Sequence, residues 1–75
     1  MWIRSQDLFT LVKCERLYVR QCASDSFDVI GDGITLGSYS TELKALKVMD
    51  ELQEEAWVEK KTYVYQMPED EDVIV

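Results

Sequence analysis

The chain has 75 residues, 47% of them hydrophobic, which suits one domain with a small core and argues against a disordered segment. Its formal net charge of −7 disfavours a protein that binds nucleic acid or an anionic membrane with its whole surface. Histidine is absent, which excludes Ser-His and Cys-His nucleophile pairs and most zinc sites.

Short segments rich in β-branched and aromatic residues predict six strands. In chain order they cover residues 2–5, 8–12, 16–22, 27–30, 34–39 and 62–67. The second of them is apolar enough to be covered on both faces. In the third, Leu17 and Val19 point to one face and Tyr18 to the other, because side chains alternate along a strand. Gly31-Asp32-Gly33 predicts a hairpin turn, since Gly and Asp tolerate positive φ.

Residues 41–61 form the one long helical pattern, with an apolar stripe at spacings of three and four residues. The stripe consists of Ala45, Met49, Leu52 and Ala56, with Leu46 beside it. Ser40 or Thr41 is expected to cap the helix N-terminus. We therefore predict an α+β fold in the order β-β-β-β-β-α-β, with a mostly antiparallel sheet of five to six short strands and the helix on one face.

The domain is expected to end near residue 68, where Pro68 stops the last strand. Residues 1–68 are predicted to form a single compact domain. Residues 69–75 begin with four consecutive acids and are predicted to be a flexible, solvated tail.

No metal or cofactor site is predicted. Cys14 and Cys22 are too few for a disulfide framework and are expected to be reduced thiols that fill apolar space. The Asp28-to-Tyr39 stretch lacks a bidentate Glu at its end, so it does not form a calcium loop. No apolar run long enough for a membrane span and no signal-peptide pattern occurs, and a cytoplasmic protein is expected.

Three short stretches carry a resemblance to a known group of proteins. They are the opening Trp-Ile-Arg-Ser-Gln-Asp at residues 2–7, Leu-Gly-Ser-Tyr-Ser-Thr-Glu at residues 36–42, and Tyr-Gln-Met-Pro at residues 65–68. The chain resembles small bacterial and phage-associated proteins that begin with Trp-Ile-Arg-Ser-Gln. The resemblance implies no activity, ligand or catalytic residue, and suggests only an accessory or mobile-element origin.

Basic and aromatic residues provide the clue to function. The candidate interaction surface consists of Trp2, Arg4, Arg16, Tyr18, Arg20 and Trp57. The aromatic rings either complete a thin core or line a surface for another protein or a second copy, since one helix covers one side of a sheet. The leading hypothesis is a non-enzymatic protein-interaction module, including self-association as a homodimer. The alternatives are a nucleic-acid-associated regulator that uses the basic, aromatic face, and an acidic mimic of DNA.

Overall fold

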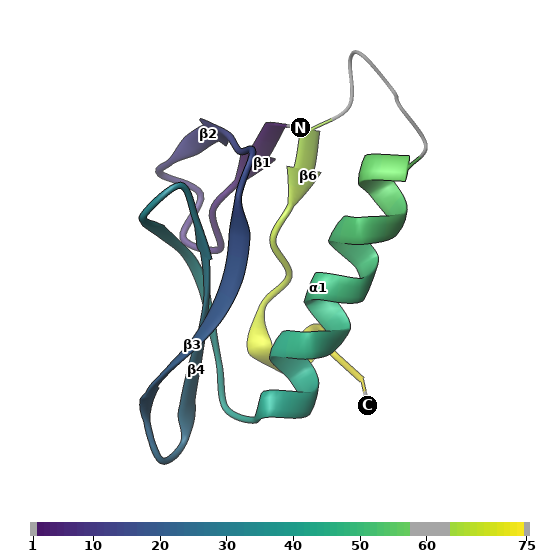
Figure 1. Cartoon of the computed structure of the whole chain (residues 1–75). Coiled ribbons are helices and arrows are strands. Elements are labelled where there is room, and N and C mark those ends of the chain that lie inside the picture. The colour runs from purple at the N-terminus through teal and green to yellow at the C-terminus, as the bar shows by residue number, and fades with distance from the viewer. Residues whose placement is uncertain (1, 58–63, 75) are drawn as a thin grey trace.

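The computed structural model describes residues 2–57 and 64–74, and the side chains of residues 2–55 and 64–74. Its elements follow the predicted order. They are β1 (Trp2–Arg4), β2 (Leu11–Lys13), β3 (Leu17–Ala23), β4 (Ser26–Gly31), β5 (Ile34–Tyr39), α1 (Glu42–Trp57), β6 (Val64–Gln66) and a short 3-10 helix (Asp70–Asp72). The predicted α+β class and the order β-β-β-β-β-α-β are confirmed (Figure 1).

The strands are divided between two three-stranded sheets. Sheet A has the order β2-β1-β6, and sheet B has the order β3-β4-β5. All neighbouring strands are antiparallel except β1 and β6, which run parallel. The two sheets meet where the chain leaves β1, because the backbone N–H of Gln6 donates to the carbonyl oxygen of Leu36 at 2.7 Å. A single expected sheet is thus replaced by two that adjoin at this point.

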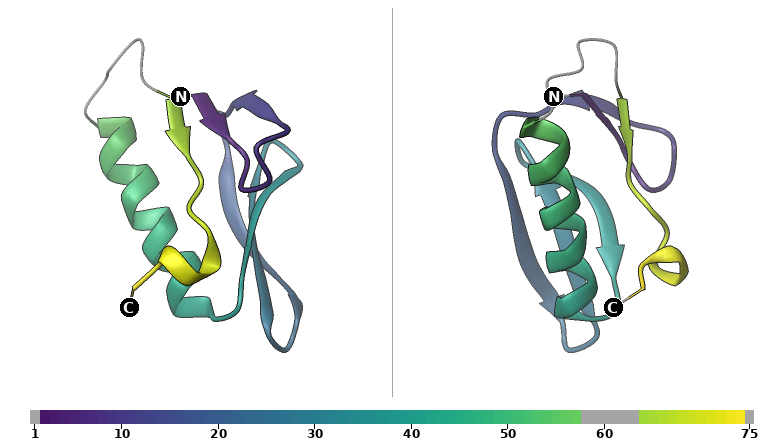
Figure 2. Two further views of the ribbon diagram at one scale, coloured as in Figure 1. Left: turned by 180° about the vertical axis from the view of Figure 1, so that it is seen from behind. Right: turned by 90° about the vertical axis from the view of Figure 1, so that its right-hand side faces the viewer.

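Helix α1 packs against sheet B, as the two views in Figure 2 show. The buried stripe consists of Ala45, Val48 and Leu52, one residue from each of three successive turns. Leu46 was expected beside the stripe, but it is 44% exposed, because the stripe is centred on Val48 and not on Met49. The hydroxyl of Thr41 accepts the backbone N–H of Lys44 and so caps the helix. The predicted helix end near residue 61 lies outside the described residues.

Both sheets and the helix share one core. Its fully buried members include Ile3 from β1, Val29 and Tyr39 from sheet B, and Leu52 from α1. The two cysteines are both free. Cys14 is buried in this core as predicted, whereas Cys22 is exposed on β3, so the expectation of an apolar filler is wrong for Cys22.

The predicted hairpin turn joins β4 to β5. Asp32 and Gly33 have φ angles of 49° and 84°, as expected of a two-residue hairpin loop. The Asp32 carboxylate also accepts the backbone N–H of Arg16 at 3.0 Å, which fixes the β2–β3 connection to this turn. A β-bulge follows in β5, where the register with β4 shifts, and Ile34 is 41% exposed although it was expected to face inward.

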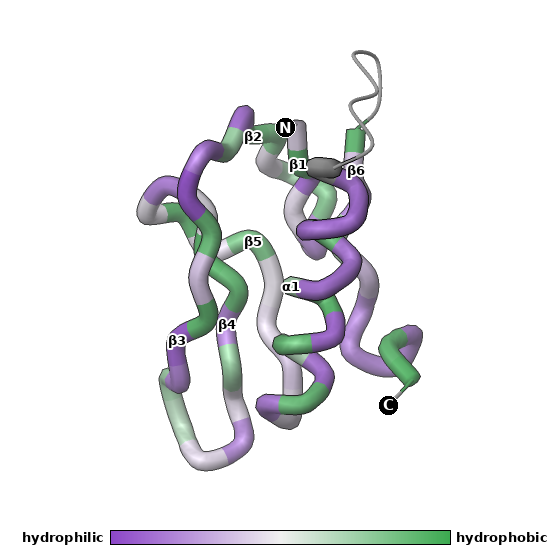
Figure 3. The backbone as a smooth tube through the Cα atoms, turned by 45° about the vertical axis from the view of Figure 1, so that its right-hand side comes forward, coloured by the Kyte–Doolittle hydropathy of each residue, from purple (hydrophilic) through white to green (hydrophobic). Residues whose placement is uncertain are grey.

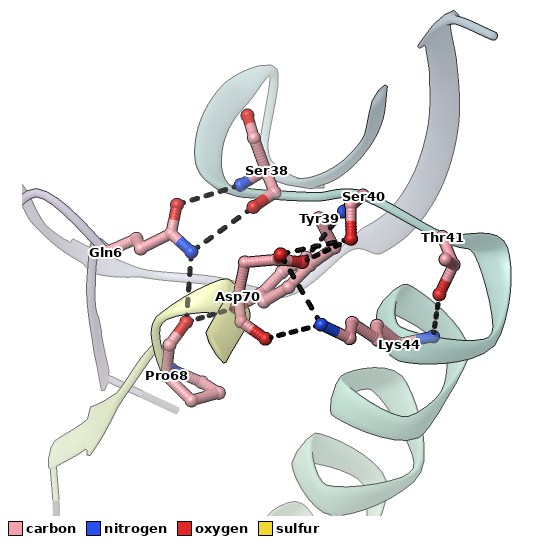
Figure 4. Close-up of polar contacts among 8 residues, drawn as sticks. All are labelled: Gln6, Ser38, Tyr39, Ser40, Thr41, Lys44, Pro68 and Asp70. Atoms are coloured by element: carbon pink, nitrogen blue, oxygen red, sulfur yellow. Dashed lines mark hydrogen bonds and ion pairs between the residues drawn. The ribbon is translucent and has the colours of Figure 1, made fainter. Parts of the chain in front are cut away.

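The C-terminal acidic run is part of the domain, contrary to the prediction of a separate tail. The Asp70 carboxylate accepts the backbone N–H of Ser40 at 2.8 Å, and Lys44 forms an ion pair with it at 3.4 Å (Figure 4). Val73 is buried in the core, and the apolar end of the chain appears green in Figure 3. Pro68 precedes these contacts, and its carbonyl oxygen accepts the hydroxyl of Tyr39 at 2.8 Å. The other three acids are exposed, as predicted for a solvated run, whereas the partners of Asp70 are remote in sequence and no local pattern reveals them.

Asp70→Asn should reduce stability in a pH-dependent way. The Ser40 backbone N–H, followed by its hydroxyl and Lys44, lowers the pKa of Asp70 below its usual 3.8. Because the pKa of Asp70 is lower in the folded state than in the unfolded state, its ionised carboxylate stabilises the fold fully at pH values above the unfolded-state pKa. That stabilisation is lost as the pH falls through the folded-state pKa. Urea unfolding at several pH values should therefore show a gap between wild type and variant at neutral pH that closes on acidification. Asp72→Asn, at an exposed neighbouring acid, is the control, and an equal gap there would contradict the assignment.

Candidate functional site

The residues predicted to form one surface are divided between the two sheets. Trp2 and Arg4 lie on the exposed face of sheet A, because Ile3 between them is fully buried. Tyr18 and Arg20 are exposed at alternate positions of β3 in sheet B. The side chain of Trp57, the last described residue of α1, lies outside the described residues.

Arg16 and Arg20 are placed in different surroundings from Arg4. Arg16 lies in the β2–β3 connection beside the turn that contains Asp32. Arg20 lies directly opposite Asp28 on β4. The basic, aromatic face predicted from the sequence is therefore not a single strand face.

Asp28 is the centre of a polar cluster on sheet B. Its carboxylate accepts the Cys22 thiol at 2.9 Å, the Ser38 hydroxyl at 2.8 Å and the Ser26 hydroxyl at 3.5 Å. These donors, led by Cys22, lower the pKa of Asp28, so it stays ionised at neutral pH. A carboxylate with a lowered pKa and three donors is a poor general base, and we assign this cluster a structural role.

The exposed face of sheet A combines apolar and cationic side chains. Strand register places Lys13, Trp2 and Val64 side by side in one row. The next row consists of Leu11, Arg4 and Gln66. Trp2, Leu11 and Val64 are all among the large exposed hydrophobic residues of the described chain.

The turn between β1 and β2 extends this apolar character. Phe9 is 92% exposed, more than any other large hydrophobic residue described, and Leu8 beside it is also exposed. Leu8 has a φ of 73°, a left-handed conformation that costs free energy for a residue with a Cβ atom. The sequence predicted a strand from residue 8, which is wrong for Leu8 and Phe9, because the turn reverses the chain there.

Hydrogen bonds from polar neighbours hold this turn. The Asp7 carboxylate accepts the Ser5 hydroxyl and the backbone N–H of Phe9. The Ser5 oxygen in turn accepts the backbone N–H of Thr10 at 3.1 Å, and the Ser5 N–H donates to the Thr10 carbonyl at 2.8 Å. The bond from Ser5, and then the one from Phe9, lowers the pKa of Asp7. At neutral pH the Asp7 carboxylate is ionised and the Ser5 hydroxyl is hydrogen-bonded, and together these two side chains hold Phe9 in the turn.

Arg4 connects the turn to the sheet face. Its Nε–H donates to the carbonyl oxygen of Leu8 at 3.1 Å, so the cation lies between β1 and the turn. We call the resulting region the Phe9 surface. It consists of Trp2, Arg4, Leu8, Phe9, Leu11, Lys13 and Val64.

Sequence reasoning identified Trp2 and Arg4 but missed Phe9. The signal was Asp7 two residues before Phe9, since an Asp side chain often accepts a backbone N–H two residues on and so forms a turn. Apolar character of residues 8–12 suggested a buried strand and concealed this alternative.

No group of Cys, Asp and Glu side chains in the described part of the chain is arranged to hold a metal ion. Across residues 2–57 and 64–74, no helix is both long and apolar enough to cross a membrane. Comparison of the chain with protein-family models, with curated proteins and with solved structures gave no significant match.

Proposed function

We propose that this protein is a non-enzymatic interaction module that binds another protein through the Phe9 surface. The observation that carries the proposal is Phe9 itself, a large aromatic side chain left almost fully in water on a turn fixed by hydrogen bonds. Burial of such a ring in a partner would contribute on the order of 1.5–3 kcal/mol. An accessory or mobile-element product that acts in the cytoplasm is part of this proposal.

Preorganisation supports the assignment. A binding side chain on a disordered loop loses conformational entropy when it binds, whereas one on a fixed turn loses much less. The strained backbone of Leu8 also supports a binding role for this turn. Local strain persists only where neighbouring interactions enforce it, and it is concentrated at functional sites. The Ser5 and Asp7 bonds are the interactions that enforce it here.

The test is affinity capture from the source cell with wild type and with Phe9→Ser. Phe9→Ser should remove the captured partner and leave the melting temperature nearly unchanged, since the side chain contributes little to the core. Ile74→Ser is the matched control, because Ile74 is also largely exposed, at 78%, but lies at the other end of the chain. Partner capture that survives Phe9→Ser, or that is lost equally with Ile74→Ser, would refute the proposal.

A nucleic-acid-binding role has less support. Arg4 and Lys13 flank Trp2 on sheet A, but Arg16 and Arg20 lie elsewhere, and Arg20 faces the ionised Asp28. An acidic mimic of DNA also loses support, because Asp70 of the acidic run is engaged by Ser40 and Lys44.

A further inference from the structure

The charges on the Phe9 surface differ in sign from those of the rest of the protein. The surface contains two basic side chains, Arg4 and Lys13, and no acidic one, a charge of +2, so the rest of the chain together carries −9. The carboxylate of Asp7, in the same turn as Phe9, is bonded to Ser5 and to the backbone of that turn. The strands of this surface contribute Arg4 and Lys13 and no acid.

These two cations lack acidic partners within the described part of the chain. The ion pair found there joins Lys44, in the first turn of α1, to Asp70 of the 3-10 helix. The start of α1 lies at the opposite end of the fold from β2 (Figure 1). The Nε–H of Arg4 donates to the carbonyl oxygen of Leu8, which holds the guanidinium beside the turn that contains Phe9. An Arg held in this way retains further N–H donors that match a carboxylate.

We propose that the partner presents a protein segment in which carboxylate side chains alternate with apolar ones. Its carboxylates pair with Arg4 and Lys13, and its apolar side chains pack on Trp2, Phe9 and Leu11. This inference rests on the proposed function and specifies the class of partner. Complementary charge at the rim sets which partner is accepted, while the buried apolar contacts supply most of the affinity.

Charge also decides against the other occupants of this surface. In a symmetric dimer on this face, Arg4 and Lys13 of one copy would approach the same cations of the other, because a two-fold contact uses one patch twice. Nucleic acid extends beyond the surface and would meet the acidic remainder of the chain. A short acidic segment on this surface would contact the two cations directly, whereas salt screens its repulsion by exposed acids more than about 8 Å away.

The experiment uses two synthetic amphipathic peptides with identical Leu and Phe positions, one with Glu and the other with Lys at the polar positions. Each is titrated into the isotope-labelled full chain and followed by NMR chemical shifts. The Glu peptide should bind at least about tenfold more tightly than the Lys peptide, with shifts confined to the Phe9 surface. Phe9→Ser should abolish binding, and Arg4→Gln with Lys13→Gln should remove the preference. Lys47→Gln, at an exposed cation on α1, should change neither.

Equal binding of the two peptides, tighter binding of the Lys peptide, binding of neither, or shifts elsewhere on the chain would each overturn the inference. Self-association in sedimentation that Phe9→Ser abolishes would also overturn it, because the occupant would then be a second copy. If the partner captured from cells still depends on Phe9 while the peptides are not distinguished, the proposed function stands and only the acidic class of partner fails.

Discussion

Leu52→Ala should lower the free energy of unfolding by about 2–5 kcal/mol, the usual cost of truncating a buried Leu. Leu52 is 1% exposed and lies where α1 meets the core shared by both sheets. Small domains have a net stability of roughly 5–15 kcal/mol, so this one change removes a large share of it. Urea unfolding followed by circular dichroism measures the loss.

Leu46→Ala is the matched control on the same helix. Leu46 is 44% exposed and six residues away from Leu52, on a different face of α1. We expect a change within about 0.5 kcal/mol there, as for most surface substitutions. Similar losses for the two variants would mean that the helix is packed on a different face from the one described.

Gly31→Ala should destabilise the protein by about 1–3 kcal/mol through overpacking. A Cβ atom at this position would lie 2.5 Å from the Sγ of Cys14 and 2.7 Å from the Cδ1 of Leu36, both much closer than van der Waals contact. Cys14 is buried in the core cluster, so its side chain cannot shift without displacing its packed neighbours. The melting temperature and urea midpoint of Gly31→Ala measure the effect.

A double-mutant cycle with Cys14→Ala tests the cause. Removing the sulfur relieves the closer of the two contacts, so the double variant should be less destabilised than the sum of the single variants. A coupling of at least about 0.5 kcal/mol is expected for residues in direct contact. Strict additivity would show that the cost of Gly31→Ala arises from something other than Cys14.

Local patterns in the sequence predicted the elements that depend on local interactions. Gly31-Asp32-Gly33 predicted its hairpin because the turn needs positive φ at its central residues, a property of those residue types alone. The helix and its cap at Thr41 were predicted because they too depend on residues close in sequence. The division into two sheets was not predicted, because it depends on the pairing of β1 with β6, which are remote in sequence.

The candidate surface was predicted only in part, for a related reason. Trp2 and Arg4 were included in the candidate surface and do share one face of β1, but alternation along a strand gives no information on whether β3 shares a sheet with β1. Arg16, Tyr18 and Arg20 were therefore grouped with them. Phe9 was missed because an apolar residue on a turn and one in a buried strand have the same hydropathy, and the bonds of Ser5 and Asp7 distinguish the two.

The parallel pairing of β1 with β6 determines the order in which this chain can fold. Trp2 pairs with Val64, so sheet A closes a loop that includes nearly the whole chain, whereas β3, β4 and β5 pair with their neighbours in sequence. Closing a long loop costs more entropy than closing short ones, so the β3-β4-β5 meander with α1 should form first. During synthesis on the ribosome, the edge of β1 that pairs with β6 stays unpaired until β6 has been synthesised. The apolar N-terminal strands are thus exposed during synthesis, when they are most open to incorrect association.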